Sequence, residues 1–299
     1  MDIVIAGGSG FIGSALTRRL LAAGHQVRVL SRSATTPVGG VEALRWDARS
    51  TGAWARQIEG CDAIINLVGQ SLVTWPWTEA TKRRFRDSRI NAGHALSEAI
   101  AGMQARPRVL IQGSGINHYG LHGTTANEST PASDDFLAQL TVDWEASTAS
   151  VEALGVRRAV VRTAVVLAAD DGLLPMIARP VRLGVGGRLG NGRQAIPWIH
   201  IEDQIGAIRH LLEHDDARGA YNLIAPTPTT SDEFLRALAK TLRRPYWLPT
   251  PAFVFRTLLG EMSVLVLDGR AALPQRLIDA GYHFRFPNVV AALANLYPN

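Results

Sequence analysis

The heptapeptide Gly7-Gly8-Ser9-Gly10-Phe11-Ile12-Gly13 decides the fold of this chain. It follows an apolar run over residues 3–6, which predicts a strand, and it opens an amphipathic segment over residues 11–23, which predicts a helix. A tight turn needs glycine, close approach to a pyrophosphate needs a missing Cβ, and a helix N-terminus offers free N–H groups to phosphates. The GxxGxxG spacing between a strand and a helix therefore predicts a dinucleotide site rather than a purely structural turn.

The first 165 residues alternate short apolar runs with longer amphipathic segments. After the first strand, we expect strands over 27–30, 63–67, 109–112 and 159–162, and helices over 79–101 and 134–154. Such alternation is typical of right-handed βαβ units. The sequence thus predicts an α/β fold, a Rossmann-type doubly wound parallel sheet.

The pattern of the sequence changes beyond residue 170. Five glycines between 184 and 192 predict irregular loops, and helical patterns resume over 202–214 and 231–242. We expect a nucleotide-binding domain over residues 1–168, to which later segments return. Residues 169–299 are expected to form mainly a smaller, substrate-side C-terminal lobe.

The composition excludes several classes of protein. With 46% apolar and 19% charged residues, the chain has the balance of a soluble globular protein. We expect a cytoplasmic protein without membrane contact, since the N-terminus lacks a signal-peptide pattern and no run of about 18 apolar residues occurs.

The single cysteine, Cys61, excludes an intrachain disulfide, and no Cys/His cluster suggests a metal site. The sequence His210-Leu211-Leu212-Glu213-His214 fits HxxEH, but without a third ligand we expect no metal there.

The net charge of +5 raises the question of nucleic acid. Arginines supply nearly all of the positive charge and are scattered, apart from a cluster over residues 82–89 on a predicted helix. No recognised nucleic-acid module accompanies that cluster, so we expect a solvated helix face and no nucleic-acid partner.

The residues at the end of the second predicted strand indicate whether the dinucleotide is NAD or NADP. An acidic residue there would hold the ribose 2′-hydroxyl of NAD, but the chain reads Val29-Leu30-Ser31-Arg32. Arg32 can contact a 2′-phosphate through two N–H groups, and Ser31 can add a hydroxyl. We therefore expect NADP(H) as the cofactor, with an exposed surface arginine as the alternative reading of Arg32.

Several motifs together resemble a known family. The turn at 7–13, Ser31-Arg32, Asn66-Leu67-Val68-Gly69 and Trp198-Ile199-His200-Ile201-Glu202-Asp203 are similar to atypical extended short-chain dehydrogenase/reductases of the NAD-dependent epimerase/dehydratase family. The segments 261–267 and 270–277 resemble the small C-terminal domain of its "epimerase family protein" subgroup, expected here over about 248–296. The resemblance spans essentially the whole chain.

The resemblance implies specific cofactor contacts. It places Gly7, Gly10, Phe11, Ile12 and Gly13 around the phosphates, Ser31 and Arg32 at the 2′-phosphate, Leu67 and Val68 on the adenosine side, Arg89 within reach of the cofactor, and Leu167 near the nicotinamide. For Leu67, Val68 and Leu167, ordinary core packing is the alternative.

The catalytic pattern of the family is missing. Its reductases and epimerases use a tyrosine and a lysine four residues later, which lowers the pKa of the tyrosine. Phe136 and Leu140 stand where that pair should fall. Ser114, one residue early for the usual serine, and Tyr119 are the remaining candidates for catalysis, although Tyr119 also fits a packing tyrosine. His118 is a further candidate proton carrier.

A glycine-rich stretch at 190–194 resembles the substrate side of the family, where an arginine can hold a phosphate or carboxylate. We expect Arg193, Gln194 and His200 to line the substrate pocket; a surface arginine, a loop amide and a structural histidine are the alternatives.

The sequence leaves two candidate functions open. The first is an NADP(H)-dependent oxidoreductase or epimerase acting on a small carbonyl or hydroxyl substrate, with a sugar nucleotide as a candidate. The second is a non-catalytic NADP(H)-sensing regulator read by a protein partner.

Overall fold

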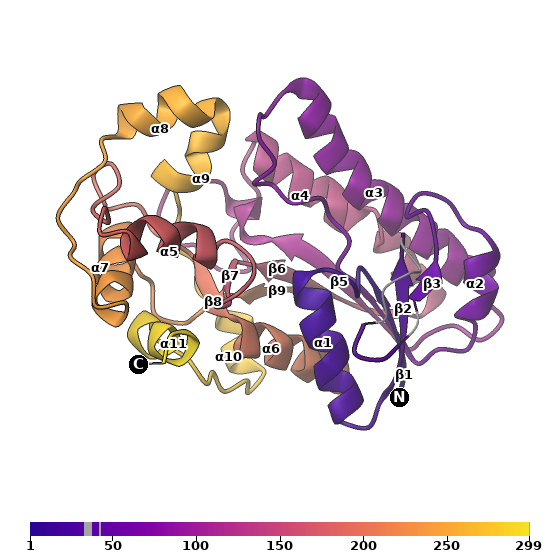
Figure 1. Ribbon diagram of the computed structural model, residues 1–299. Helices are drawn as coiled ribbons and strands as arrows, with labels where there is room; N and C mark the ends of the chain where they lie inside the picture. The colour runs from indigo at the N-terminus through magenta and orange to yellow at the C-terminus, as the bar shows by residue number, and fades with distance from the viewer. Residues whose placement is uncertain (33–37, 42, 299) are drawn as a thin grey trace.

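The computed structural model describes residues 1–32, 38–41 and 43–298. Its centre is a seven-stranded sheet in the order β3-β2-β1-β4-β5-β6-β9, in which every neighbouring pair is parallel (Figure 1). The strands are β1 (Asp2–Ala6), β2 (Gln26–Ser31), β3 (Ala43–Arg45), β4 (Ala63–Asn66), β5 (Val109–Gly115), β6 (Arg157–Thr163) and β9 (Gly219–Leu223). This order confirms the predicted Rossmann-type fold.

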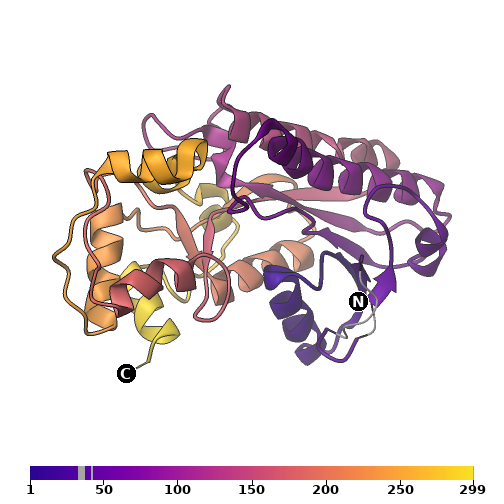
Figure 2. The ribbon, with the colours of Figure 1, turned by 45° about the horizontal axis from the view of Figure 1, so that its top comes forward.

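Helices cover both faces of the sheet (Figures 1 and 2). Side chains alternate along β1, so that Ile3 and Ile5 pack into one apolar cluster while Val4 and Ala6 pack into another. The first cluster includes α1 (Phe11–Ala22) and α6 (Ile201–Glu213), and the second includes α2 (Ala53–Gln57) and α3 (Glu79–Gly102). Burial on both faces explains why the strands read as continuous apolar runs.

The C-terminal lobe stands beyond the β9 edge of the sheet (Figure 1). Its elements are a two-stranded parallel sheet of β7 (Val165–Leu167) and β8 (Trp198–His200), with α5 (Leu174–Arg182), α7 (Ser231–Thr241), α8 (Ala252–Leu259), α9 (Val264–Leu267) and α11 (Val289–Leu296). The short helix α10 (Gln275–Asp279) packs instead against β9 of the large sheet, with Leu277 in its core. Trp198, Phe234, Leu238 and Leu293 belong to the apolar core of the lobe. The chain leaves this lobe to form α6 and β9, so the lobe is not continuous in sequence.

The expected helix over 134–154 is two elements, α4 (Phe136–Ala146) and a 3-10 helix at Ala149–Leu154. The Ser147 hydroxyl donates to the Trp144 carbonyl oxygen at 2.7 Å, an interaction typical of residues that disfavour a helix interior. Conversely, α5 forms in a stretch for which no helix was predicted. Proline in its first turn is compatible with a helix start, although Pro180 lies inside it.

None of the helices in the described ranges combines the length and the apolar character needed to cross a membrane.

Candidate functional site

The glycine turn joins β1 to α1 and leaves the helix N-terminus open. Gly7 has φ +81°, and a Cβ on Gly13 would lie 2.2 Å from the Gly7 carbonyl oxygen. Gly10 is the N-cap of α1 in an extended conformation, and within the described residues the helix start has no side-chain cap. A Cβ on Gly7 would lie 3.1 Å from the Leu67 main chain at the end of β4. This is a cradle of free N–H groups that fits the pyrophosphate of a dinucleotide.

The end of β2 lies beside this turn. Ser31 is buried, and its Oγ lies 3.1 Å from Oγ of Ser9 within the glycine turn. Arg32 follows and is exposed. The carboxylate that selects NAD is missing from this strand end, and an exposed guanidinium stands there instead. The arrangement fits a ribose 2′-phosphate.

Arg89 of α3 is a buried cation at the edge of the same site. Its side chain donates to the Phe85 and Gln70 carbonyl oxygens at 3.0 and 2.9 Å, and its guanidinium lies 4.9 Å from the ring centre of Trp144. Burial lowers the pKa of Arg89 to about 10. Within the described ranges no carboxylate lies within 4.0 Å of it. An anionic group of a bound cofactor would offset the cost of that buried charge.

The apolar residues assigned to the cofactor differ in exposure. Leu67 and Val68 are half-buried at the end of β4, as are Phe11 and Ile12 at the start of α1. Leu167 is fully buried in the core of the C-terminal lobe, which agrees with its alternative as a core residue.

Ser114 lies at the centre of a buried polar network. Its hydroxyl donates to Glu145 of α4 at 2.6 Å. Glu145 in turn accepts from Arg162 of β6 through both carboxylate oxygens, at 2.8 and 2.9 Å. His118 Nδ1 lies 3.7 Å from the same carboxylate. Burial and the charge of Arg162 lower the pKa of His118, so this imidazole is neutral near pH 7.

Tyr119 extends the same network toward β9. It is 1% exposed; its hydroxyl donates to Asn222 Oδ1 at 2.7 Å and accepts from Arg162 at 2.9 Å. Burial raises the pKa of Tyr119 despite the nearby guanidinium. The phenol is therefore protonated and fully engaged, which favours the structural reading of this residue.

Phe136 and Leu140 occupy the first turns of α4, where the family carries its tyrosine and lysine. Phe136 packs edge-on against Trp77, with ring centres 6.1 Å apart, and the Lys82 ammonium lies 5.4 Å from its ring centre. Lys82 also forms an ion pair at 2.5 Å with Glu261 of the C-terminal lobe. The phenyl ring of Phe136 thus stands in place of the family's phenol. The C-terminal lobe contacts this region through Glu261, which pairs with the Lys82 ammonium beside the ring.

The three predicted pocket residues differ in exposure and in their partners. Arg193 is exposed. Gln194 is half-buried and donates to the carbonyl oxygens of Leu189 and Val266. His200 is 1% exposed, accepts from the Glu202 N–H at 3.1 Å as the N-cap of α6, and stacks on Phe286. The structure thus favours a structural histidine at 200 and leaves Arg193 and Gln194 as the pocket candidates.

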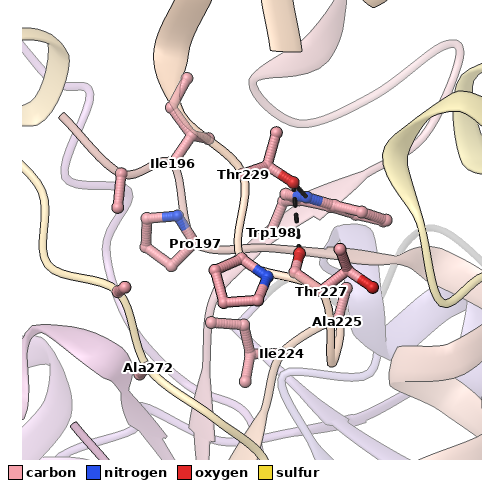
Figure 3. Close-up of a pocket in the computed structure, with 11 residues that line it drawn as sticks. Ile196, Pro197, Trp198, Ile224, Ala225, Thr227, Thr229 and Ala272 are labelled. Carbon is pink, nitrogen blue, oxygen red and sulfur yellow. Dashed lines mark hydrogen bonds between the residues drawn. The ribbon is translucent and has the colours of Figure 1, made fainter. Parts of the chain in front are cut away.

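A small cavity lies between the segment 195–198, which leads into β8, the segment 224–229 and the segment 271–272 (Figure 3). Its volume is about 10 Å³, and Thr229 accepts from Trp198 Nε1 and donates to the Thr227 carbonyl oxygen on one side of it. That volume suits one water molecule and excludes a substrate.

The HxxEH histidines lie at the end of α6. Their rings stack with centres 3.7 Å apart, and His210 Nε2 lies 2.9 Å from the Ala280 carbonyl oxygen. Within the described ranges, no group of three or more histidine, cysteine or acidic residues is arranged to hold a metal ion.

Sequence reasoning missed three members of the polar network: Glu145, Arg162 and Asn222. The sequence could have indicated a buried ion pair at Arg162, because a charged residue inside a buried strand pattern needs a partner. Glu145 and Asn222 lie on other elements, so their role needed the tertiary structure.

Comparison with known proteins agrees with this geometry. The model of the NAD dependent epimerase/dehydratase family matches residues 3–223, and the domain of unknown function DUF1731 matches residues 250–296. The chain is 37% identical to epimerase family protein YfhF of Bacillus subtilis over 300 residues, covering 99% of this chain and 98% of that protein. It is 36% identical to bovine epimerase family protein SDR39U1, with 98% of each chain covered.

Solved structures of epimerase proteins also resemble this chain over nearly its whole length. The crystal structure of human epimerase family protein SDR39U1 with NADPH is 32% identical, covers 100% of both chains and has a TM-score of 0.90. The nucleoside-diphosphate sugar epimerase of Corynebacterium glutamicum is 25% identical, with a TM-score of 0.80, 99% of this chain and 58% of that chain covered. This chain therefore belongs to the NAD-dependent epimerase/dehydratase family and, with its DUF1731 domain, to the epimerase family protein subgroup.

Proposed function

We propose that this chain binds NADP(H) and acts as an oxidoreductase or epimerase on a carbonyl or hydroxyl group of a small substrate. The observation that carries the proposal is the open N-terminus of α1 beside the exposed guanidinium of Arg32. The glycine cradle would hold the pyrophosphate, Ser31 and Arg32 the 2′-phosphate, and Arg89 a further anionic group. The NADPH in the human relative supports this choice of cofactor.

Bound NADP(H) would supply the hydride, and the chain would supply orientation and a polar group for the substrate. Ser114 is the strongest candidate for that group, since the Glu145 carboxylate fixes its hydroxyl. Tyr119 is better suited to positioning, because its hydroxyl is occupied on both sides: it donates to Asn222 and accepts from Arg162. Ser114 and Tyr119 therefore remain our proposed catalytic and positioning residues, respectively.

A sugar nucleotide is our candidate substrate class. The likeness to a nucleoside-diphosphate sugar epimerase supports it, and the exposed Arg193 could pair with a phosphate. We retain the cytoplasm as the proposed location, without a nucleic-acid partner.

The test has two arms. Small aldehydes and ketones are incubated with 4-deuterated NADPH, which reports reduction of a carbonyl. A panel of UDP-sugars is incubated with NADP⁺, because their hydroxyl groups must first be oxidised, and an epimeric product or NADPH formation is monitored. Loss of NADPH fluorescence or transfer of deuterium to a product would support the enzyme. Ser114→Ala should then slow turnover while NADPH affinity stays unchanged. Ser97→Ala is the control, since this buried serine donates to the Ser147 carbonyl oxygen, outside the network. Wild-type turnover in Ser114→Ala would remove Ser114 from the mechanism.

The second candidate function is a non-catalytic NADP(H) sensor. Phe136 and Leu140 in place of the tyrosine and lysine favour it, and the Lys82–Glu261 ion pair gives the lobe a contact beside Phe136. Hydrogen exchange over residues 260–271 would then differ between NADPH and NADP⁺, without turnover of any substrate. Glu261→Gln should reduce that difference. Identical exchange with both forms would argue against a sensor.

A further inference from the structure

An open groove lies on the C-terminal lobe, away from the glycine turn. Its volume is about 480 Å³. The lining residues come from the loop after β7, the end of α5, the end of α7 and the C-terminal end of α11: Ala169, Asp170, Arg182, Thr241, Leu242, Arg243, Leu296, Tyr297 and Pro298. None of these residues is assigned above to the cofactor or the substrate, and the volume lies within the range of small-molecule sites.

Two exposed guanidiniums stand on the walls of this groove. Arg182 ends α5, and its guanidinium lies 4.8 Å from the ring centre of Tyr297. Arg243 follows α7. In the part of the chain that the structure describes, neither side chain has a carboxylate within 4.0 Å. Among the described lining residues, the two arginines are opposed by one acidic residue, Asp170.

The backbone of Arg243 is in an unfavourable conformation. Its φ is +54°, in the left-handed region, and it lies directly after the C-cap residue Leu242 of α7. Glycine is the usual residue at this position of a helix end, because a Cβ is disfavoured there. The Arg244 N–H donates to the Ala239 carbonyl oxygen at 2.9 Å, so the end of α7 holds Arg243 in this conformation.

The rest of the lining is apolar or aromatic. Leu242 and Leu296 are half-buried, and so is the Tyr297 ring, whose hydroxyl lies 3.5 Å from the Ala169 carbonyl oxygen. The groove therefore combines a cationic wall with an apolar one. Such a combination matches a molecule that carries an anionic group on an apolar body.

We propose that this groove is a binding site for a small organic anion, in which Arg182 and Arg243 pair with a phosphate or carboxylate group and Leu242, Leu296 and Tyr297 contact its apolar body. The site is separate from the cofactor site. The loop that lines it continues to Gly172, where a Cβ would lie 2.8 Å from the Phe11 ring at the cofactor turn. The two sites are thus joined by one short segment.

The test is calorimetric titration of phenyl phosphate and of benzoate into the full chain saturated with NADPH, which occupies the phosphate contacts of the glycine turn. Saturable binding of at least one of the two is expected, and phenol should not bind. Arg182→Gln and Arg243→Gln should each weaken binding by about ten-fold, the loss of one charge-assisted contact. Arg244→Gln is the matched control, because Arg244 is the exposed neighbour of Arg243 in the chain and does not line the groove.

Arg243→Gly separates binding from folding. This variant relieves the left-handed backbone, so its thermal unfolding midpoint should be no lower than that of the wild type, while binding is lost. The proposal is overturned if neither anion binds saturably at millimolar concentration, or if Arg182→Gln and Arg243→Gln bind as well as Arg244→Gln.

Discussion

The guanidinium of Arg162 donates two hydrogen bonds to the carboxylate of Glu145, from Nε to Oε1 at 2.8 Å and from Nη2 to Oε2 at 2.9 Å. The two side chains are 8% and 16% exposed. Burial alone would raise the pKa of Glu145, but the hydrogen bonds and charge of Arg162 outweigh it and hold the pKa below its ordinary value. This pair ties α4 to β6 and fixes the acceptor for Ser114.

Replacement of Glu145 should be strongly destabilising. Glu145→Gln leaves the buried guanidinium without its counter-charge, which costs about 3–5 kcal/mol in the free energy of unfolding. Urea denaturation measures this loss. The control is Glu152→Gln, because Glu152 is 51% exposed in its 3.0 Å pair with Arg158 and its loss should cost under about 1 kcal/mol. Equal losses in the two variants would contradict a special role for the buried pair.

Tyr119→Phe tests whether the phenol is a positioning group. The variant leaves Arg162 Nη1 and Asn222 Oδ1 each short of a partner, so we expect a loss of about 1–3 kcal/mol of stability with unchanged NADPH affinity. Tyr297→Phe is a milder comparison, since that hydroxyl lies 3.5 Å from its acceptor. A stable Tyr119→Phe protein would show that the network does not depend on the phenol.

Acidification should destabilise the protein through His118. Burial, with the charge of Arg162, lowers the pKa of His118 below its ordinary value of 6.5. The unfolded chain therefore binds this proton more readily than the folded chain. The stability contribution is complete above pH 6.5 and is lost as the pH falls toward the folded-state pKa. Unfolding free energies measured across this range should fall less steeply in His118→Gln, and an unchanged slope would refute the assignment.

Gly13→Ala should abolish NADPH binding, because the new Cβ would lie 2.2 Å from the Gly7 carbonyl oxygen and must displace the turn. A titration monitored by NADPH fluorescence checks this. Gly102→Ala is the matched control at the end of α3, where a Cβ would meet no atom within 4 Å and should leave binding intact. If Gly13→Ala bound NADPH normally, the turn would not be the phosphate cradle.

The sheet and the glycine turn could be predicted because their signals are local. Strands buried on both faces are short apolar runs, and only glycine fits a turn as tight as that at Gly7 and Gly13. Short edge elements such as β3 and α2 were not predicted, since three to five residues carry little periodicity.

The interior of the candidate site could be predicted only in part. Ser114 and Tyr119 were identified, but their partners Glu145 and Asn222 lie 31 and 103 residues away in sequence and meet them only in the folded sheet. His200 was expected in the substrate pocket, whereas it caps α6 through its Nδ1 atom. Histidine is not among the common N-cap residues, so the sequence carried no clear signal of that role.

The most direct test of the account is the affinity of NADPH and NADH for the wild type and for Arg32→Glu, measured by calorimetric titration with Arg18→Glu as a control on the exposed side of α1. We predict that the wild type binds NADPH more tightly by at least about ten-fold, the value of one charge-assisted contact, and that Arg32→Glu alone removes this preference. Equal binding of the two nucleotides by the wild type, or a preference that survives Arg32→Glu, would contradict the account.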